Sequence, residues 1–183
     1  MLPQAFVFSG SRNLILLLIG VSAYLVVAKP AWLFHRDPVV VTEYAAWEAE
    51  GLLDKGRGHP QVLYLYASTC GPCRSILKGV NALAEDCEDA GVGFTAVALD
   101  EDPDRLEAYL TKEGAVFSPV WLTPSDKWSL VDGLKRRGSD LSNSLSTPYF
   151  VILDDNAQVA AEWAGTPGLK DAREELKREG VKL

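Results

Sequence analysis

The stretch "YASTCGPCRS", residues 66 to 75, holds two of the three cysteines of the 183-residue chain, separated by a glycine and a proline. A near-continuous apolar run, "QVLYLYA" (61 to 67), leads into it and predicts a strand that is covered on both faces. After Cys73, apolar residues recur at helical spacing as far as Cys87, which predicts a helix that begins at the CGPC. We therefore expect a strand, the two cysteines and a helix in direct succession.

This succession suits thiol chemistry. The free N–H groups and partial positive charge at the start of a helix lower the pKa of a cysteine placed there, and the thiolate is the nucleophile in disulfide exchange. Cys70 is then expected to be the exposed attacking thiol, and Cys73, one turn further and facing the core, the resolving thiol. Gly71 allows close backbone approach, and Pro72 has no N–H to lose in the first helical turn.

Two cysteines at this spacing can also bind a metal ion. A structural zinc ion needs four ligands. Apart from Cys87, the chain offers only His35 and His59 as further cysteine or histidine ligands, and neither stands at ligand spacing. We therefore expect no metal and no cofactor, with a redox-active Cys70–Cys73 disulfide as the only reactive group.

Cys87 is not expected to join this pair. It follows Cys73 by 14 residues in one predicted helix, a separation of about 21 Å, whereas a disulfide needs Cα atoms within roughly 7 Å. Its position on the apolar face instead predicts a packing residue, because free cysteine packs as a small hydrophobe.

The N-terminal segment differs from the rest of the chain. "NLILLLIGVSAYLVVA" (13 to 28) has no charge between Arg12 and Lys29, and as a helix it would be about 24 Å long, slightly short of the hydrocarbon core of a bilayer. We expect residues 1 to 36 to hold a transmembrane anchor and a linker, with a cleaved signal peptide as the alternative. In both cases the domain that follows, residues 37 to 183, is exported if the N-terminus stays inside.

The charge of this domain limits its partners. Residues 1 to 36 carry three basic and no acidic side chains, so the remainder has 25 acidic and 15 basic side chains. A domain this acidic is a poor match for the phosphate backbone, and we expect no nucleic-acid partner.

The rest of the domain is predicted to alternate between strands and helices. Thr42 is expected to cap a helix that ends at "GRGH" (56 to 59). The remaining predicted elements are a strand at 92 to 100, a helix at 103 to 114, a strand, turn and strand within 148 to 165, and a closing helix at 168 to 180. The acidic residues 100 to 104 are interpreted as a strand end and a helix cap, because they lack the ligand pattern of a calcium loop.

The segment "VLYLYASTCGPCRSIL" resembles the active-site segment of the thioredoxin superfamily. "VALDEDPDRLEAYL", followed by "GAVFSPVWL", resembles its TlpA/ResA/DsbE branch of membrane-anchored thiol-disulfide proteins. The resemblance implies an α/β thioredoxin-like fold, with a central mixed sheet flanked by helices, preceded by the transmembrane helix. It also implies an insert at about 115 to 146, for which the sequence predicts a helix at 129 to 137.

The same resemblance adds Thr147 and Pro148 to the site. They match the family's cis-proline, which lies beside the dithiol at the start of a strand, and the backbone of Thr147 would pair with the substrate chain. Two positions depart from the family. Tyr64 stands where thioredoxins have a buried aspartate, and Thr69 stands where most relatives have tryptophan.

Together these features predict a thiol-disulfide oxidoreductase. The resemblance implies that it reduces protein disulfides outside the cytoplasm, as in cytochrome c maturation, from the periplasmic side of the inner membrane and with a membrane electron donor. Two alternatives stay open at this point. The first is a disulfide oxidase or isomerase for secreted proteins, and the second is a non-enzymatic binding or assembly module with an idle dithiol.

Overall fold

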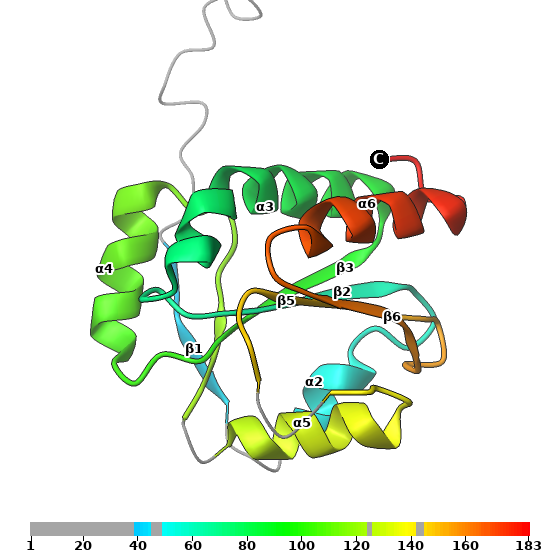
Figure 1. Cartoon of the computed structure of the whole chain (residues 1–183), viewed down its shortest axis with the longest axis horizontal. Helices are drawn as coiled ribbons and strands as arrows, with labels where there is room; N and C mark the ends of the chain where they lie inside the picture. Colours follow the sequence, from blue (N-terminus) through cyan, green and yellow to red (C-terminus); the bar gives the residue numbers. More distant parts are fainter. Residues whose placement is uncertain (1–38, 45–48, 124–125, 142–144) are drawn as a thin grey trace, which may run out of the picture. The chain divides into compact units, whose positions relative to one another are not determined.

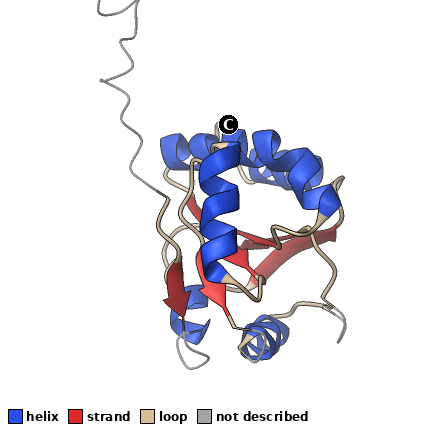
Figure 2. Ribbon diagram, turned by 90° about the vertical axis from the view of Figure 1, so that its left-hand side faces the viewer, coloured by secondary structure: helices blue, strands red, loops and turns tan. Residues whose placement is uncertain are grey.

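A single mixed sheet organises the residues that the structure describes, which are 39–44, 49–123, 126–141 and 145–183. In this computed structural model the strand order is β1-β4-β3-β2-β5-β6, with helices on both faces of the sheet (Figures 1 and 2). The expected mixed sheet flanked by helices is therefore confirmed. The predicted anchor at 13 to 28 lies outside the described residues, and none of the described helices is long and apolar enough to cross a membrane.

The elements alternate along the chain as strands and helices. In order they are β1 (Thr42–Tyr44), α2 (Ala49–Asp54), β2 (Gln61–Tyr66), α3 (Gly71–Ala90), β3 (Gly93–Ala98), α4 (Pro103–Glu113), β4 (Val120–Leu122), α5 (Lys127–Arg136), β5 (Tyr149–Leu153), β6 (Val159–Ala164) and α6 (Gly168–Arg178).

Strand β2 lies in the middle of the sheet and leads directly to the cysteines. It pairs in parallel with β3 and antiparallel with β5, and all six of its residues are buried. The continuous apolar run is explained by this position, because a central strand covered by helices on both faces has no side that meets water.

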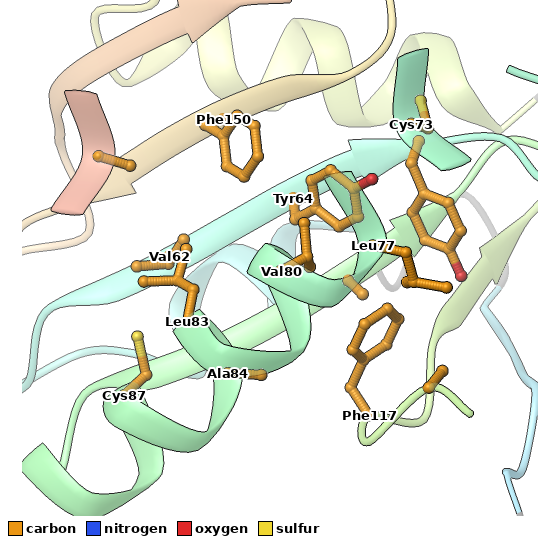
Figure 3. Packing of buried hydrophobic residues seen from close by; sticks show 14 of the residues in the cluster. Val62, Tyr64, Cys73, Leu77, Val80, Leu83, Ala84, Cys87, Phe117 and Phe150 are labelled. Atoms are coloured by element: carbon orange, nitrogen blue, oxygen red, sulfur yellow. The ribbon is translucent and has the colours of Figure 1, made fainter. Parts of the chain in front are cut away.

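Two hydrophobic cores lie on opposite faces of the sheet. On one face of the sheet lie α3 and α6 (Figure 1), and their side chains pack with those of β2 and β5 in one core. On the other, α2 and α5 cover a cluster that consists mainly of leucine and valine. Residues of the first core are drawn in Figure 3, where the apolar side of α3 faces the sheet. Burial of this apolar area is the main force that holds α3, and with it the cysteines, against β2.

The expectation that Thr42 caps a helix is wrong. Residues Thr42–Tyr44 form strand β1, which pairs in parallel with β4, and the backbone N–H of Thr42 donates to the carbonyl oxygen of Pro119. This pairing joins residues almost eighty positions apart, so the local cap signal of Thr42 had no means of revealing it.

The segment between α4 and β5 contributes more than the single helix that the sequence predicted. Its helix α5 is found at Lys127–Arg136, close to the predicted 129 to 137. In addition, Val120–Leu122 form strand β4, which enters the sheet between β1 and β3 and is parallel to both. This segment is therefore part of the sheet, and β4 lies next to β3, whose last residue, Ala98, comes two residues before Asp100.

Candidate active site

The first turn of α3 presents the CGPC, as the sequence predicted. Cys70 is the N-cap residue, with an extended backbone (φ −74°, ψ 109°), and Pro72 lies in the first turn. The backbone N–H of Cys73 donates to Cys70 Sγ over 3.2 Å. One of the free N–H groups at the helix start is thus directed at the sulfur of Cys70, which is the arrangement that stabilises a thiolate there.

The two cysteines form a disulfide and differ in their access to solvent. Their Cα atoms are 5.3 Å apart, within the range that a disulfide requires. Cys73 is 3% exposed and belongs to the core beneath α3, whereas Cys70 is half-buried and Gly71 and Pro72 are exposed. An incoming thiol or disulfide can therefore reach the sulfur of Cys70 more readily than that of Cys73.

Thr147 and Pro148 lie beside the dithiol. The bond between them is a cis peptide, and the carbonyl oxygen of Thr147 is 3.4 Å from Cys70 Sγ. At this distance a reduced Cys70 can donate its S–H to the carbonyl, because thiols are weak hydrogen-bond donors. The structure thus brings together all six residues that the sequence analysis placed in the site: Cys70, Gly71, Pro72, Cys73, Thr147 and Pro148.

One residue of this region was missed by the sequence analysis. Asp100 follows β3, is 7% exposed, and accepts three hydrogen bonds from Ser68, two residues before Cys70. The backbone N–H of Ser68 donates to both carboxylate oxygens over 3.0 Å, and its hydroxyl donates to one of them over 2.5 Å. The sequence signal was present, since an aspartate two residues after a strand that is parallel to β2 lies at the same end of the sheet as the cysteines.

The helix cap in the acidic segment is Asp102. Its side chain accepts from the backbone N–H groups of Asp104 and Arg105, which confirms the interpretation of this segment as a strand end and a helix cap. The carboxylates of Asp100 and Asp102 therefore have different partners, one at the cysteine loop and one at the start of α4.

Tyr64 occupies the position where the resembled family has an aspartate. Its ring stacks on Tyr66 and on Phe150 at centroid distances of 4.9 and 5.0 Å, and Figure 3 shows Tyr64 in the same core as Cys73. Neither tyrosine hydroxyl has a hydrogen-bond partner among the described residues. Burial raises the pKa of Tyr64 and of Tyr66 far above the ordinary value for tyrosine, so both stay neutral at physiological pH and neither can replace a carboxylate as a base.

Cys87 lies apart from the reactive pair. It is fully buried and faces the sheet from the far end of α3 (Figure 3). Burial raises the pKa of its thiol to about 12, so the reactive thiolate is scarce at neutral pH. Its expected packing role is confirmed by this position.

The histidines do not join the cysteines in the described part of the chain. His59 is exposed in the turn before β2, at the end of that strand opposite to the cysteines, and His35 lies outside the described residues. Among the described side chains, no group of three or more His, Cys, Asp or Glu residues is placed to hold a metal ion.

Comparison with solved structures identifies similar folds. A Chlorobium tepidum protein provisionally described as the thiol:disulfide interchange protein DsbE matches 71% of this chain and 85% of its own, at 24% identity and a TM-score of 0.55. A second C. tepidum protein, a thiol:disulfide interchange protein of the thioredoxin family, matches 67% and 81% at 19% identity and a TM-score of 0.54. StoA from Bacillus subtilis matches 64% and 82% at 16% identity and a TM-score of 0.51.

Comparisons with protein-family models and with curated proteins give no match. The structural likeness therefore supports a conclusion about the fold, and the expectation of a thioredoxin-like α/β fold is confirmed at that level. Within this fold, the cysteines of this chain lie between a central strand and the first turn of a helix, beside a cis X-Pro bond.

Proposed function

We propose that this thioredoxin-fold protein is a thiol-disulfide oxidoreductase, in which Cys70 attacks and Cys73 resolves. The observation that carries the proposal is the unequal placement of the two disulfide-bonded sulfurs at the start of α3. Cys70 receives a helix N–H and is half-exposed, whereas Cys73 is 3% exposed. Disulfide exchange requires this difference in exposure, because one thiol must attack the substrate and the other must then resolve the mixed disulfide. A metal site or an inert scaffold does not require it.

In the reducing direction, the Cys70 thiolate attacks one sulfur of a substrate disulfide. A bond forms between Cys70 and that sulfur, the substrate S–S bond breaks, and the departing thiolate takes a proton from solvent. Cys73 then loses its proton and attacks Cys70 Sγ, which expels the second substrate thiolate and leaves the Cys70–Cys73 disulfide. Two electrons pass from the dithiol to the substrate, and an external dithiol donor must restore the reduced form.

The substrates that we propose are protein disulfides held in an extended segment of chain. The backbone of Thr147 lies next to Cys70, and Pro148 alone separates it from β5. A substrate strand that pairs with it would therefore carry its own sulfur towards Cys70. The resemblance to the TlpA/ResA/DsbE branch favours a reductase of particular disulfides, such as those formed during cytochrome c maturation, with a membrane protein as the electron donor.

The direction of electron flow is tested by the reduction potential of the dithiol, measured at equilibrium with glutathione or dithiothreitol. A value near that of thioredoxin, about −270 mV, supports a reductase, and a value near −120 mV supports an oxidase. Reduction of insulin by dithiothreitol, followed by turbidity, tests the activity itself. A binding module with an idle dithiol would accelerate neither insulin reduction nor the oxidation of a reduced protein.

We further propose that residues 13 to 28 anchor the protein in the inner membrane, with the domain on the periplasmic side. The support is the uncharged run itself and the oxidising compartment that a substrate disulfide requires. Protease added to the outer face of the inner membrane is expected to digest the domain, and carbonate washing is expected not to release the full-length chain. Protection from protease, or release by carbonate, would contradict this topology.

A further inference from the structure

The carboxylate of Asp100 and the loop that carries Cys70 are joined by three hydrogen bonds. All three come from Ser68, through its backbone N–H and its hydroxyl, and both residues are buried. The same loop ends with a turn in which the N–H of Cys70 donates to the carbonyl oxygen of Ala67. Asp100 therefore holds the backbone immediately before the attacking sulfur.

The backbone of Asp100 also forms a hydrogen bond with a side chain of β4. The indole N–H of Trp121, in β4, donates to the backbone carbonyl oxygen of Asp100 over 2.8 Å. The chain thus has a continuous connection from β4 through Asp100 and Ser68 to Cys70. Hydrogen bonds at both its backbone and its carboxylate oxygens thus fix the position of Asp100 relative to the cysteine loop.

Among the described residues, the partners of the Asp100 carboxylate are the hydrogen-bond donors of Ser68. No described lysine or arginine forms an ion pair with it, although such pairs occur elsewhere in the domain. Ser68 is two residues from Cys70, a span of at most about 7 Å, and its nitrogen is 3.0 Å from the carboxylate oxygens. The anion therefore lies within about 10 Å of the Cys70 backbone, which is about one Debye length. A buried anion at that distance opposes the formation of a thiolate.

The other titratable and charged groups around Asp100 come from three elements. Tyr66 lies in β2 and Tyr109 in α4, and the negative charge of Asp100 contributes to raising the pKa of both, although burial contributes most. Arg74, in α3, lies with its guanidinium 5.4 Å from the ring centre of Tyr109. Both tyrosines are neutral at physiological pH, and the charges that act on Tyr109 besides that of Asp100 are those of Arg74 and Glu113.

We propose that Asp100 is a positioning residue for the dithiol: it holds the loop that presents Cys70, and its charge limits how strongly the helix start stabilises the attacking thiolate. The proposal deepens the proposed oxidoreductase function and rests on it for its biological meaning. A less stabilised thiolate makes the reduced form less stable relative to the disulfide, which is the property of a reductase. Asp100 thereby opposes the effect of the helix start on Cys70.

The test compares three single variants in which Cys70 is titrated by the ultraviolet absorbance of its thiolate. Asp100→Asn removes the charge and keeps the shape, and it is expected to lower the pKa of Cys70 by about 0.5 to 1 unit. Ser68→Ala keeps the charge but removes one compensating hydroxyl, so it is expected to raise this pKa slightly. Glu101→Gln, at the exposed neighbouring position, is the control and should leave it unchanged.

The equilibrium with glutathione supplies a second measurement. For Asp100→Asn the constant is expected to shift three- to tenfold towards the dithiol, or about 15 to 30 mV. A loss of thermal stability in Asp100→Asn with neither a pKa shift nor an equilibrium shift would reduce Asp100 to a structural role and overturn the proposal. If Asp100→Asn does not fold, the sign of the Ser68→Ala shift decides, because an unchanged or lowered pKa contradicts an acting charge. Neither measurement needs substrate turnover, so a wild-type protein that fails to reduce insulin would count against the proposed function alone.

Discussion

The sulfur of Cys70 and the carbonyl oxygen of Thr147 lie 3.4 Å apart, although 77 positions separate the two residues in the chain. This proximity arises because β5, which begins directly after Pro148, pairs antiparallel with β2, which ends directly before the cysteine loop. The C-terminal end of β2 and the N-terminal end of β5 therefore lie side by side. The backbone of Thr147 therefore lies directly beside the sulfur that is expected to attack.

The division of labour between the two cysteines predicts different behaviour of the two serine variants. With Cys73→Ser, the mixed disulfide on Cys70 has no intramolecular thiol to resolve it, so substrate should remain attached in a complex that dithiothreitol dissolves. With Cys70→Ser, no such complex should form, because Cys73 is buried. Non-reducing electrophoresis after mixing with an oxidised protein substrate measures the complex. Equal trapping by both variants, or by neither, would contradict the assignment of Cys70 as nucleophile.

Cys87 is predicted to matter for stability and not for exchange. Cys87→Ala should lower the free energy of unfolding by about 1 kcal/mol, because it removes a buried sulfur from the core beneath α3. Insulin reduction should stay at the wild-type rate. The pKa of about 12 also predicts that Cys87 resists alkylation in the folded protein at neutral pH, and mass spectrometry of alkylated samples tests this directly. Rapid labelling of Cys87 would show that the packing interpretation is incomplete.

Tyr64→Phe should leave the protein as stable as before or more stable by about 1 kcal/mol. The variant keeps the ring stack with Tyr66 and Phe150 and removes a buried hydroxyl that has no partner among the described residues. Burying an unsatisfied polar group is unfavourable, so its removal is not expected to cost stability. Denaturant unfolding provides the measurement.

The same variant tests whether Tyr64 takes part in proton transfer. Because its raised pKa keeps it neutral, the rate of insulin reduction and its pH profile should not change. A pH profile displaced in Tyr64→Phe, with the fold intact, would show that the hydroxyl acts on Cys73 after all.

Two glycine-to-alanine changes separate a substrate contact from a packing contact. A Cβ at Gly168 would lie 2.9 Å from Trp163 Cβ and 3.0 Å from Phe150 Cδ2, so Gly168→Ala should lower the free energy of unfolding by about 1 to 3 kcal/mol.

A Cβ at Gly71 would meet nothing within 4 Å, so Gly71→Ala should leave stability unchanged or slightly higher. Exchange with protein disulfides should nevertheless slow in Gly71→Ala, because the methyl group obstructs a substrate backbone at Cys70. Wild-type exchange rates in this variant would show that close approach at Gly71 is not required.

The strand, the CGPC and the helix after it could be predicted from the sequence because their signals are local. The apolar run of β2 follows from burial on both faces of the sheet, and the spacing after Cys73 follows from the period of a helix packed on one side. These two patterns meet at the cysteines, so the sequence alone indicated which sulfur is at the helix start and which faces the core. Cys87 was assigned to the core for the same reason.

Other features depend on contacts between distant residues and were decided by the tertiary structure. Thr42 carries a local signal for a helix cap, yet its backbone pairs with the strand Val120–Leu122, whose three residues are too few for a period to be recognised. Asp100 could be assigned to a strand end, but only the parallel pairing of β2 and β3 brings its carboxylate to Ser68. A short pattern specifies how a segment is buried and not which segment buries it, since many pairings satisfy the same backbone hydrogen bonds. The pairing that forms is the one in which both cores are filled at once.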